Sequence, residues 1–369
     1  MKVAIAHDYL NQYGGAERVL GAFFKLFPDA HLYTLTADRR MPWHGFGDAL
    51  RGTSFLDIPF VARHHRLFIP LMPLAARTVR FKDRYDLVIS ATAGYAKGVR
   101  VPPGAFHLSY CYTPLRYAWE SDAYLPWRIF APLARPLIAY LRSWDRAASE
   151  RPHAMVAISE FIREKIRRYY GRDAAVVYPP VDGEAFYFEQ ARSKPPAGES
   201  YYLAAGRLLP YKKFDVVIQA FRNLELPLKI VGVGREARAL RRLAAGKSNI
   251  SFVDFVSDED LRALYAGARA FIMPQAEDFG LVAAEAQRCG TPVVAFAEGG
   301  ALEIVEPGKT GVLFEEQSVP HLIRAVQAVK RMSFNRAYIA RRAKLFSFAA
   351  FKRGILAHIP VSVRRAVRR

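Results

Sequence analysis

An α/β fold with two doubly wound parallel sheets is predicted by three features of this 369-residue sequence. Short apolar segments alternate with amphipathic ones from residue 201 to residue 314. A noisier series of the same kind fills residues 3–178, and a stretch with two prolines and a glycine separates the two at 194–198. At about 150 residues per domain, the length suggests two or three domains. The simplest architecture is a pair of Rossmann-like domains that face each other across a cleft.

The second half of the sequence gives the clearer pattern. Strands are expected at 201–205, 228–232, 250–256, 270–274, 292–296 and 311–314. Helices are expected near 214–221, 237–245 and 261–266, and a further helix is expected to carry Glu285. This alternation of single strands and single helices is typical of a parallel sheet.

The first half repeats the pattern with longer insertions. Strands are expected at 3–6, 31–35, 87–91, 107–112, 155–158 and 176–178. The insertions near 40–84 and 114–150 are basic, aromatic and rich in proline. We therefore expect an N-terminal domain at 1–182, a linker at 183–200, a C-terminal domain at 201–346 and a separate basic segment at 347–369.

The net charge of +20 is unevenly distributed along the chain. Residues 1–198 hold 27 Lys and Arg against 18 Asp and Glu, residues 199–329 hold 15 against 16, and residues 330–369 hold 12 against none. The excess positive charge thus lies outside the nearly neutral second domain, which indicates a second, larger anionic partner.

Two cysteines, Cys111 and Cys289, are too few for a disulfide scaffold or a cysteine-rich metal site and fit a reducing cytosol. The first residues predict a strand and not a secretory signal. No apolar run reaches the roughly 18 residues of a membrane-spanning helix. We expect a cytoplasmic protein.

The strongest functional signal is the stretch from Glu277 to Glu285. The two carboxylates flank Gly280, where a strand-like segment gives way to a helix. A helix N-terminus carries unpaired N–H groups and a partial positive charge, and Glu285 would lean back toward it. Carboxylates beside an anion site suit a ligand that also carries hydroxyl groups, so the segment indicates a nucleotide sugar. The alternative is a solvated Glu277 and a Glu285 on the helix surface.

Two turns after predicted strands support the same ligand. Arg207 and Lys212 follow the first strand of the second half, where they could hold a diphosphate. Gly14 and Gly15 follow the first strand of the chain and open a helix, which allows close backbone approach to phosphate or sugar. A solvated charged turn and an ordinary strand-to-helix turn are the alternatives.

Other polar residues have structural explanations. The acidic triplet Asp258, Glu259 and Asp260 follows Ser257, which predicts a capped helix start and not a metal site. No other cluster of His, Cys and carboxylates suggests a metal. Asp8, near the end of the first strand, could cap a helix or face the cleft.

Two basic segments also contain many apolar residues. Residues 61–85 hold six Lys and Arg and one acid among leucines, isoleucine and phenylalanines, and residues 126–146 have a similar mixture with two tryptophans. Such a mixture suits the surface of an anionic bilayer. The alternative is that the apolar residues form core while the charges are solvated.

These residues resemble a known family. The spacing from Glu277 to Glu285 is similar to the signature of the retaining glycosyltransferases of family 4, which have the GT-B fold. The segment with Gly206, Arg207 and Lys212 resembles the phosphate-binding segment of that family. Residues 7–10 and 14–18, and Tyr110 together with residues 113–119, resemble bacterial mannosyltransferases of O-antigen and exopolysaccharide assembly.

The resemblance implies metal-independent transfer of a sugar from a nucleotide diphosphate sugar with retention of anomeric configuration. Arg207 and Lys212 would hold the diphosphate with the amides of Gly280, Leu281 and Val282. Glu285 would bind the ribose, Glu277 the donor sugar, and Gly15 would approach the diphosphate from the other domain. The resemblance also implies that the segment 347–369 packs back on the N-terminal domain.

The sequence departs from this subfamily at Tyr112, where the family often has a His that faces the donor sugar. A tyrosine offers a hydroxyl but does not titrate near neutral pH. We expect transfer of a hexose, mannose from GDP-mannose or a sugar from a UDP donor, to a lipid-linked saccharide at the inner face of the cell membrane. No cofactor is expected beyond the nucleotide sugar. A nucleotide-sugar epimerase or hydrolase is an alternative, and so is a basic nucleic-acid-binding protein, although no nucleic-acid motif is found.

Overall fold

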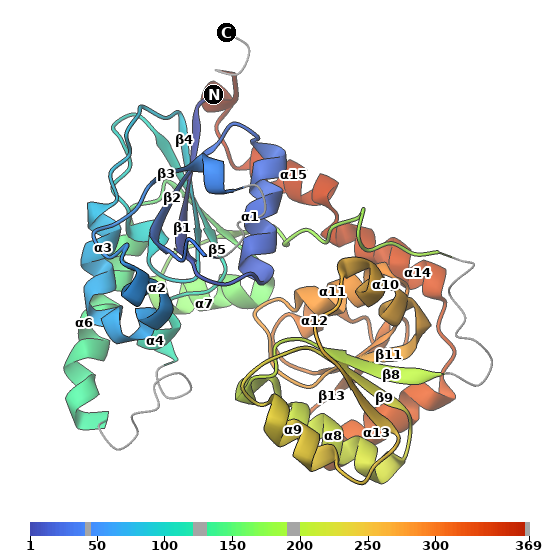
Figure 1. The fold of residues 1–369 in the computed structure, drawn as a ribbon. Coiled ribbons are helices and arrows are strands. Elements are labelled where there is room, and N and C mark those ends of the chain that lie inside the picture. Colours follow the sequence, from blue (N-terminus) through green and yellow to red (C-terminus); the bar gives the residue numbers. More distant parts are fainter. Residues whose placement is uncertain (41–45, 121–130, 190–199, 366–369) are drawn as a thin grey trace. The chain divides into compact units, whose positions relative to one another are not determined.

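The computed structural model describes residues 1–40, 46–120, 131–189 and 200–365. The chain divides into two compact units (Figure 1). The first consists of Met1–Tyr178 together with Phe351–Arg369, and the second of Pro179–Ala350. Each unit is built on its own parallel sheet, which confirms the predicted α/β class with two doubly wound sheets.

The first unit has seven parallel strands in the order β3-β2-β1-β4-β5-β6-β7. The strands are β1 (Val3–Leu10), β2 (His31–Ala37), β3 (Leu50–Gly52), β4 (Leu87–Thr92), β5 (Phe106–Cys111), β6 (Ala154–Ala157) and β7 (Ala175–Val176). β1 pairs in register with β2 through Ala4 and His31, and with β4 through Ala4 and Val88. The order reverses between β1 and β4, the point where open α/β sheets bind ligands beyond the carboxyl ends of their strands.

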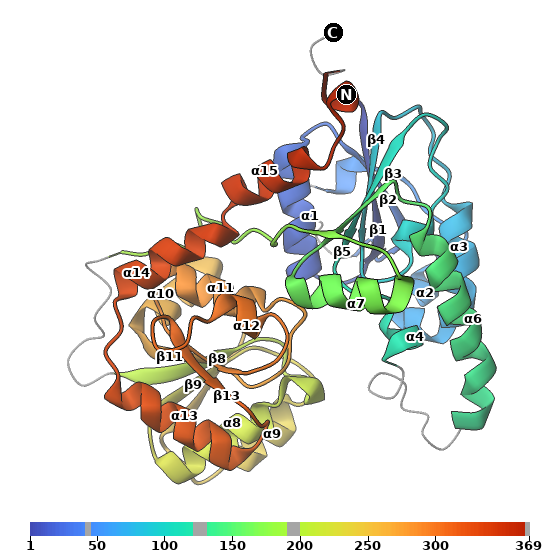
Figure 2. The same cartoon turned by 180° about the vertical axis from the view of Figure 1, so that it is seen from behind.

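Helices cover both faces of this sheet (Figures 1 and 2). Helix α1 (Gly15–Leu26) lies on one face, and α2 (Pro59–His64), the 3₁₀ turn η2 (His65–Leu71) and α3 (Met72–Thr78) cover the other. Further elements of this unit are η3 (Ala96–Gly98), α4 (Arg116–Trp119), α6 (Ala131–Ser149), α7 (Glu160–Tyr170) and α16 (Val361–Arg365). Alternate residues of a strand face opposite sides, so Ala4 and Ala6 join the core under α2 and α3.

The second unit has six parallel strands in the order β10-β9-β8-β11-β12-β13. The strands are β8 (Tyr201–Ala205), β9 (Leu228–Val231), β10 (Ile250–Val253), β11 (Ala268–Met273), β12 (Val293–Phe296) and β13 (Gly311–Phe314). Here the order reverses between β8 and β11. The turns that follow these two strands carry Arg207, Lys212 and Glu277, so the predicted residues lie at the expected point of the sheet.

Apolar helix faces bury the second sheet. Helices α8 (Phe214–Leu224), α9 (Ala237–Ala244) and α13 (Val319–Arg331) pack on one side through residues such as Phe221, Leu240 and Val326. The remaining helices are α10 (Asp258–Gly267), α11 (Leu281–Arg288), α12 (Ala301–Ile304) and α14 (Arg336–Arg342), followed by the 3₁₀ turn η7 (Ala343–Phe346).

Most predicted elements are observed within a few residues of their expected bounds. The predicted cap of α10 is confirmed, because the Ser257 hydroxyl accepts a hydrogen bond from the amide of Asp260 at 3.1 Å. Strand β3 lies in the insertion 40–84, where no strand was predicted. The basic segment 126–146 and the linker 183–200 lie partly outside the described residues.

The chain returns to its first unit near the C-terminus. Helix α15 (Phe348–Ala357) contains Phe351, whose ring contacts Phe23 of α1 at 5.1 Å and Tyr110 of β5 at 5.8 Å between centroids. Gly354 lies against Val177, where a Cβ would come within 2.7 Å of the valine side chain. The core of the first unit therefore includes residues from both ends of the described chain.

Candidate functional site

Two predicted site residues meet at the carboxyl ends of β8 and β11. The ammonium of Lys212, on the turn after β8, forms an ion pair with Oε1 of Glu277, on the loop after β11. Gln275 Nε2 donates to the same carboxylate oxygen at 2.8 Å. The side chains of Lys212 and Glu277 keep 14% and 19% of their exposure, so both remain accessible to a small ligand.

The backbone of Glu277 is fixed by a glycine pair that sequence reasoning missed. Gly300 N donates to the carbonyl of Glu277 at 2.8 Å, and Gly299 has a positive φ of 70°. A Cβ on Gly299 would lie 2.2 Å from Glu277 O, and one on Gly300 would lie 2.0 Å from Phe279 O. Only glycine allows this close approach. The signal in the sequence was a second glycine pair shortly after a predicted strand, similar to Gly14 and Gly15.

Helix α11 begins directly after this loop. Gly280 is its N-cap residue with φ of 97°, so Leu281 and Val282 form the first turn. The first amides of a helix have no partner within the helix and favour an anion. The predicted start of this helix near Gly280 agrees with the structure.

Glu285 is a buried residue and not part of the helix surface. It is 3% exposed, and the hydroxyl of Tyr265 donates to its Oε2 at 3.4 Å. Burial raises the pKa of the neighbouring Cys289 thiol to about 12, and the negative charge of Glu285 adds to this shift. The alternative of a solvated surface glutamate is therefore excluded for Glu285.

The turn with Arg207 is braced by backbone contacts. Leu208 N donates to Val233 O at 2.9 Å, and Gly206 N donates to Val231 O at 3.0 Å. A Cβ on Gly232 would lie 1.9 Å from Gly206 O, so glycine is required where the two turns cross. Arg207 itself is exposed on this rigid turn. The structure thus brings Lys212 and Glu277 into contact and places Arg207 on the same loop as Lys212.

In the first unit, Gly14, Gly15 and Tyr112 gather around the start of α1. The carboxylate of Glu17 accepts a hydrogen bond from Gly14 N at 2.7 Å and thereby caps the helix. The Tyr112 hydroxyl donates to Ala16 O at 3.1 Å. Burial raises the pKa of Tyr112 well above its usual value, so this hydroxyl stays protonated.

His7 and Glu17 are two residues of this region that were not predicted as site residues. His7 Nε2 lies 3.6 Å from Glu17 Oε1, and both side chains are almost completely buried. Burial disfavours the charged imidazolium, but the hydrogen bond and the charge of Glu17 outweigh it and raise the pKa of His7. The available signals were a His directly after the predicted strand 3–6 and a Glu at the third position of the helix that begins at Gly15.

Asp8 binds the backbone of the turn that follows β4. Its carboxylate accepts hydrogen bonds from the amides of Ala93, Tyr95 and Ala96 at 2.5, 2.9 and 2.6 Å, and from the Thr92 hydroxyl at 3.0 Å. Asp8 therefore fixes the turn between β4 and η3 and is a structural anchor.

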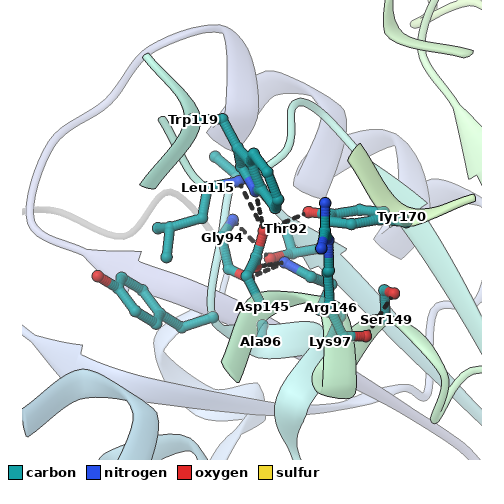
Figure 3. Close-up of polar contacts among 12 residues, drawn as sticks. Thr92, Gly94, Ala96, Lys97, Leu115, Trp119, Asp145, Arg146, Ser149 and Tyr170 are labelled. Carbon is teal, nitrogen blue, oxygen red and sulfur yellow. Dashed lines mark hydrogen bonds and ion pairs between the residues drawn. The ribbon is translucent and has the colours of Figure 1, made fainter. Parts of the chain in front are cut away.

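A buried ion pair holds the segment that follows Tyr112 (Figure 3). Lys97 Nζ lies 2.5 Å from Asp145 Oδ1, with neither side chain exposed, and also donates to Gly94 O. The other oxygen, Oδ2, accepts from Tyr170 Oη at 2.7 Å and Trp119 Nε1 at 2.8 Å. Asp145 of α6 thus ties α4 and α7 together.

Two further properties concern only the described residues. Among them, no group of three or more His, Cys, Asp or Glu side chains is arranged to hold a metal ion. In the same part of the chain, no helix combines the length and apolar character needed to cross a membrane.

Comparison with known proteins identifies the family. A model described as Glycosyltransferase Family 4 matches residues 13–185, and one described as Glycosyl transferases group 1 matches residues 187–346. The chain belongs to glycosyltransferase family 4. The resemblance inferred from the motifs is confirmed at this level. The likeness to mannosyltransferases in particular stays an expectation.

Curated relatives of this family 4 protein share parts of the sequence. The D-inositol 3-phosphate glycosyltransferase of Mycobacterium tuberculosis is 33% identical over 223 residues, which cover 54% of this chain and 45% of the relative. An uncharacterized glycosyltransferase of Methanocaldococcus jannaschii is 25% identical over 181 residues, 48% of this chain and 49% of the relative. The chain thus spans about half the length of the curated relatives it matches.

Solved structures confirm the GT-B fold. HepE of Anabaena, determined with UDP and glucose, superposes with a TM-score of 0.71 at 18% identity and covers 97% of this chain and 98% of its own. Sucrose-phosphate synthase of Thermosynechococcus elongatus gives the same score and identity, with 99% of both chains covered.

Proposed function

We propose that this family 4 protein transfers a sugar from a nucleotide diphosphate sugar to an acceptor hydroxyl with retention of anomeric configuration. The observation that carries the proposal is the contact between Lys212 and Glu277 next to the N-terminus of α11. A cation, a carboxylate and unpaired helix amides in one place complement a ligand with both phosphate and hydroxyl groups.

Each group has a distinct role in this proposal. Lys212 and Arg207 bind the diphosphate and stabilise the charge that develops on it as the bond to the sugar breaks. The amides of Gly280, Leu281 and Val282 bind the same group. Glu277 then exchanges part of its contact with Lys212 for hydroxyls of the donor sugar, and Glu285 receives the ribose hydroxyls.

The first unit has a candidate contact of its own, the turn at Gly14 and Gly15. The absence of side chains there permits close backbone approach to a phosphate or sugar group. Tyr112 stays neutral and donates to Ala16 O, so we assign it a positioning role at the start of α1 in place of the proton-transfer role open to a histidine.

The donor and acceptor are the finer part of the proposal. Mannose from GDP-mannose follows from the motif resemblance, whereas a UDP-sugar is supported by the similar fold of HepE, which was determined with UDP-glucose. A lipid-linked saccharide is the proposed acceptor, so the protein would work at the inner face of the cell membrane against an anionic surface. Metal independence is part of the same proposal and predicts full transfer in the presence of EDTA.

A thermal-shift screen against nucleoside diphosphates and nucleotide sugars tests the donor site. A ligand that binds only the folded protein raises the melting temperature. At a ligand concentration of 100 times its Kd, the free energy of unfolding increases by about 2.7 kcal/mol. We expect one base to stabilise the wild type strongly and the Lys212→Ala variant weakly. A Lys309→Ala variant, which changes an exposed lysine of the same unit, serves as the matched control. Equal shifts in wild type and Lys212→Ala would contradict the site.

The same ligands distinguish the alternative functions. A nucleotide-sugar epimerase or hydrolase converts the donor without an acceptor, whereas a transferase requires one. A nucleic-acid-binding protein would bind duplex DNA with a steep dependence on salt and would not be stabilised by nucleotide sugars.

A further inference from the structure

The first unit exposes an apolar surface formed by residues 55–74. Six large hydrophobic side chains of this stretch are between 43% and 65% exposed, and they are Phe55, Ile58, Phe60, Leu67, Leu71 and Leu74. Exposed hydrophobic residues normally occur singly. Here six of the fourteen large ones in the described residues lie within 20 positions. This 55–74 surface runs from the loop before α2 through η2 into α3 (Figure 1).

The helices under this surface are apolar on both sides. Val61, Ile69 and Met72 are buried against the sheet. Phe60, Leu67, Leu71 and Leu74 are exposed along the same succession of α2, η2 and α3. The four exposed side chains are therefore not part of the buried core.

The surface is held in place from below. Asn11 Nδ2 donates to Ala62 O at 3.0 Å and contacts His65 Nδ1 at 2.9 Å. The rings of Phe60 and Phe68 meet edge to face at 6.2 Å. These contacts fix the backbone at Ala62 and the rings of His65 and Phe60, so a partner meets a surface that is partly formed in advance.

The exposed charged side chains within residues 55–80 are all basic. Arg63, Arg66, Arg77 and Arg80 are exposed. The acid within residues 55–80 is Asp57, whose side chain is 9% exposed and bound to Arg39 at 2.9 Å. Basic and apolar side chains on one face complement a bilayer with anionic headgroups. A second copy of this chain would present the same arginines, and like charges disfavour that pairing.

We propose that the 55–74 surface docks on an anionic lipid bilayer. The six hydrophobic side chains enter the headgroup region, and the arginines around them contact lipid phosphates. The proposal rests on the membrane location suggested above and names the residues responsible for it. None of its residues is among those assigned to the donor site, so the two proposals can be tested separately.

Vesicle sedimentation of the full chain tests the hydrophobic part. We use vesicles of phosphatidylcholine alone and of phosphatidylcholine mixed with phosphatidylglycerol. The triple variant Leu67→Gln, Leu71→Gln, Leu74→Gln should lower partition onto mixed vesicles by more than about tenfold, since three apolar side chains no longer leave water. The control is Leu345→Gln, which alters a leucine of the second unit that is 48% exposed, and it should bind like wild type.

A second pair of variants tests the charges. Arg63→Gln with Arg77→Gln should weaken binding to mixed vesicles by about tenfold or more and make it less sensitive to salt. Arg238→Gln, at an exposed arginine of α9, should leave binding unchanged. Equal binding of wild type to both vesicle types would overturn the assignment to anionic lipid.

Three readouts separate the outcomes. A Leu67→Trp variant should show a blue shift in the tryptophan emission that the substitution adds when mixed vesicles are present. Vesicle binding without any shift would place the contact elsewhere.

Sedimentation equilibrium without lipid should give the same mass for wild type and the triple leucine variant. A dimer that the triple variant abolishes would assign the surface to self-association and overturn the proposal. The nucleotide-dependent thermal shift should be unchanged in every variant, so failure here is distinguishable from failure of the donor site.

Discussion

Lys212 and Glu277 stand 65 positions apart in the sequence and share one ion pair at the ends of adjacent strands. Each charge is partly shielded from water, and each lies in a turn whose backbone is fixed by glycine contacts. A ligand that binds here must replace part of the contact between Lys212 and Glu277. The interactions of both residues should therefore change when the ligand binds.

Replacing either partner should remove transfer while the fold persists. We expect Glu277→Gln and Lys212→Ala to lower kcat/KM by roughly 10²–10³-fold, since each removes a preorganised charge at the proposed reacting centre. Product formation from the best donor of the screen measures this effect. Glu316→Gln, at an exposed glutamate of the same unit, is the control. Wild-type kinetics in both site variants would exclude the pair from the reaction.

Asp8 should contribute strongly to the stability of the first unit. Asp8→Asn replaces an acceptor with a side chain that carries N–H donors toward the amides of Ala93, Tyr95 and Ala96. Hydrogen bonds to a buried charged group are worth about 1.5–3 kcal/mol each, so we expect a loss of about 3 kcal/mol or more. Urea unfolding followed by circular dichroism measures it, with the exposed Asp48→Asn as control. A loss below about 1 kcal/mol would mean that the turn is held by other contacts.

The buried pair of Lys97 and Asp145 should respond differently to single and double substitution. Lys97→Met leaves the Asp145 carboxylate buried without its cation and should cost about 3–5 kcal/mol. The double variant Lys97→Met, Asp145→Leu removes both charges and should be more stable than Lys97→Met alone. Comparison of the urea midpoints tests this order. If the loss in the double variant equalled the sum of the losses from Lys97→Met and from Asp145→Leu, the two residues would have no coupling.

The free energy of unfolding should decrease as the pH is lowered, because of His107. Burial lowers the pKa of His107 to about 3, and nearby His153 and arginines add to the effect. The unfolded chain, with an ordinary pKa near 6.5, takes up the proton more readily than the folded protein. Above the unfolded pKa, His107 is neutral in both states and does not lower the free energy of unfolding. Below it, proton uptake by the unfolded chain lowers this free energy by up to about 1.4 kcal/mol per pH unit.

Urea unfolding between about pH 7.5 and pH 5 measures this slope. His107→Gln cannot titrate and should give a flatter dependence than the wild type. His64→Gln, at an exposed histidine, is the control variant. Parallel curves for wild type and His107→Gln would show that His107 is not responsible.

The sequence predicted the second unit better than the first for a physical reason. In the second unit, each strand is a short apolar run bounded by glycine, proline or charge, as at residues 201–205. The pattern around Glu277 was visible because the motif is continuous in sequence. Strand β3 was missed because three residues at an edge, only one of them apolar, carry no periodic signal.

Several site contacts depend on distant segments and could not be predicted from local patterns. The crossing of Gly299 and Gly300 over residues 277–279 joins two loops through backbone atoms, for which side-chain patterns give no information. The buried position of Glu285 depends on Tyr265, 20 residues earlier. The exposed 55–74 surface could not be told from core by composition, because helices of this kind usually bury such residues.

The contact between Phe351 and Phe23 has a consequence for synthesis. The segment Met1–Tyr178 leaves the ribosome first, but part of its interior is supplied by a helix made more than 300 residues after Phe23. Until translation reaches Phe351, the aromatic rings of Phe23 and Tyr110 have no cover from that helix. The segment that is made earlier therefore acquires its full aromatic core only after a segment made much later has been added.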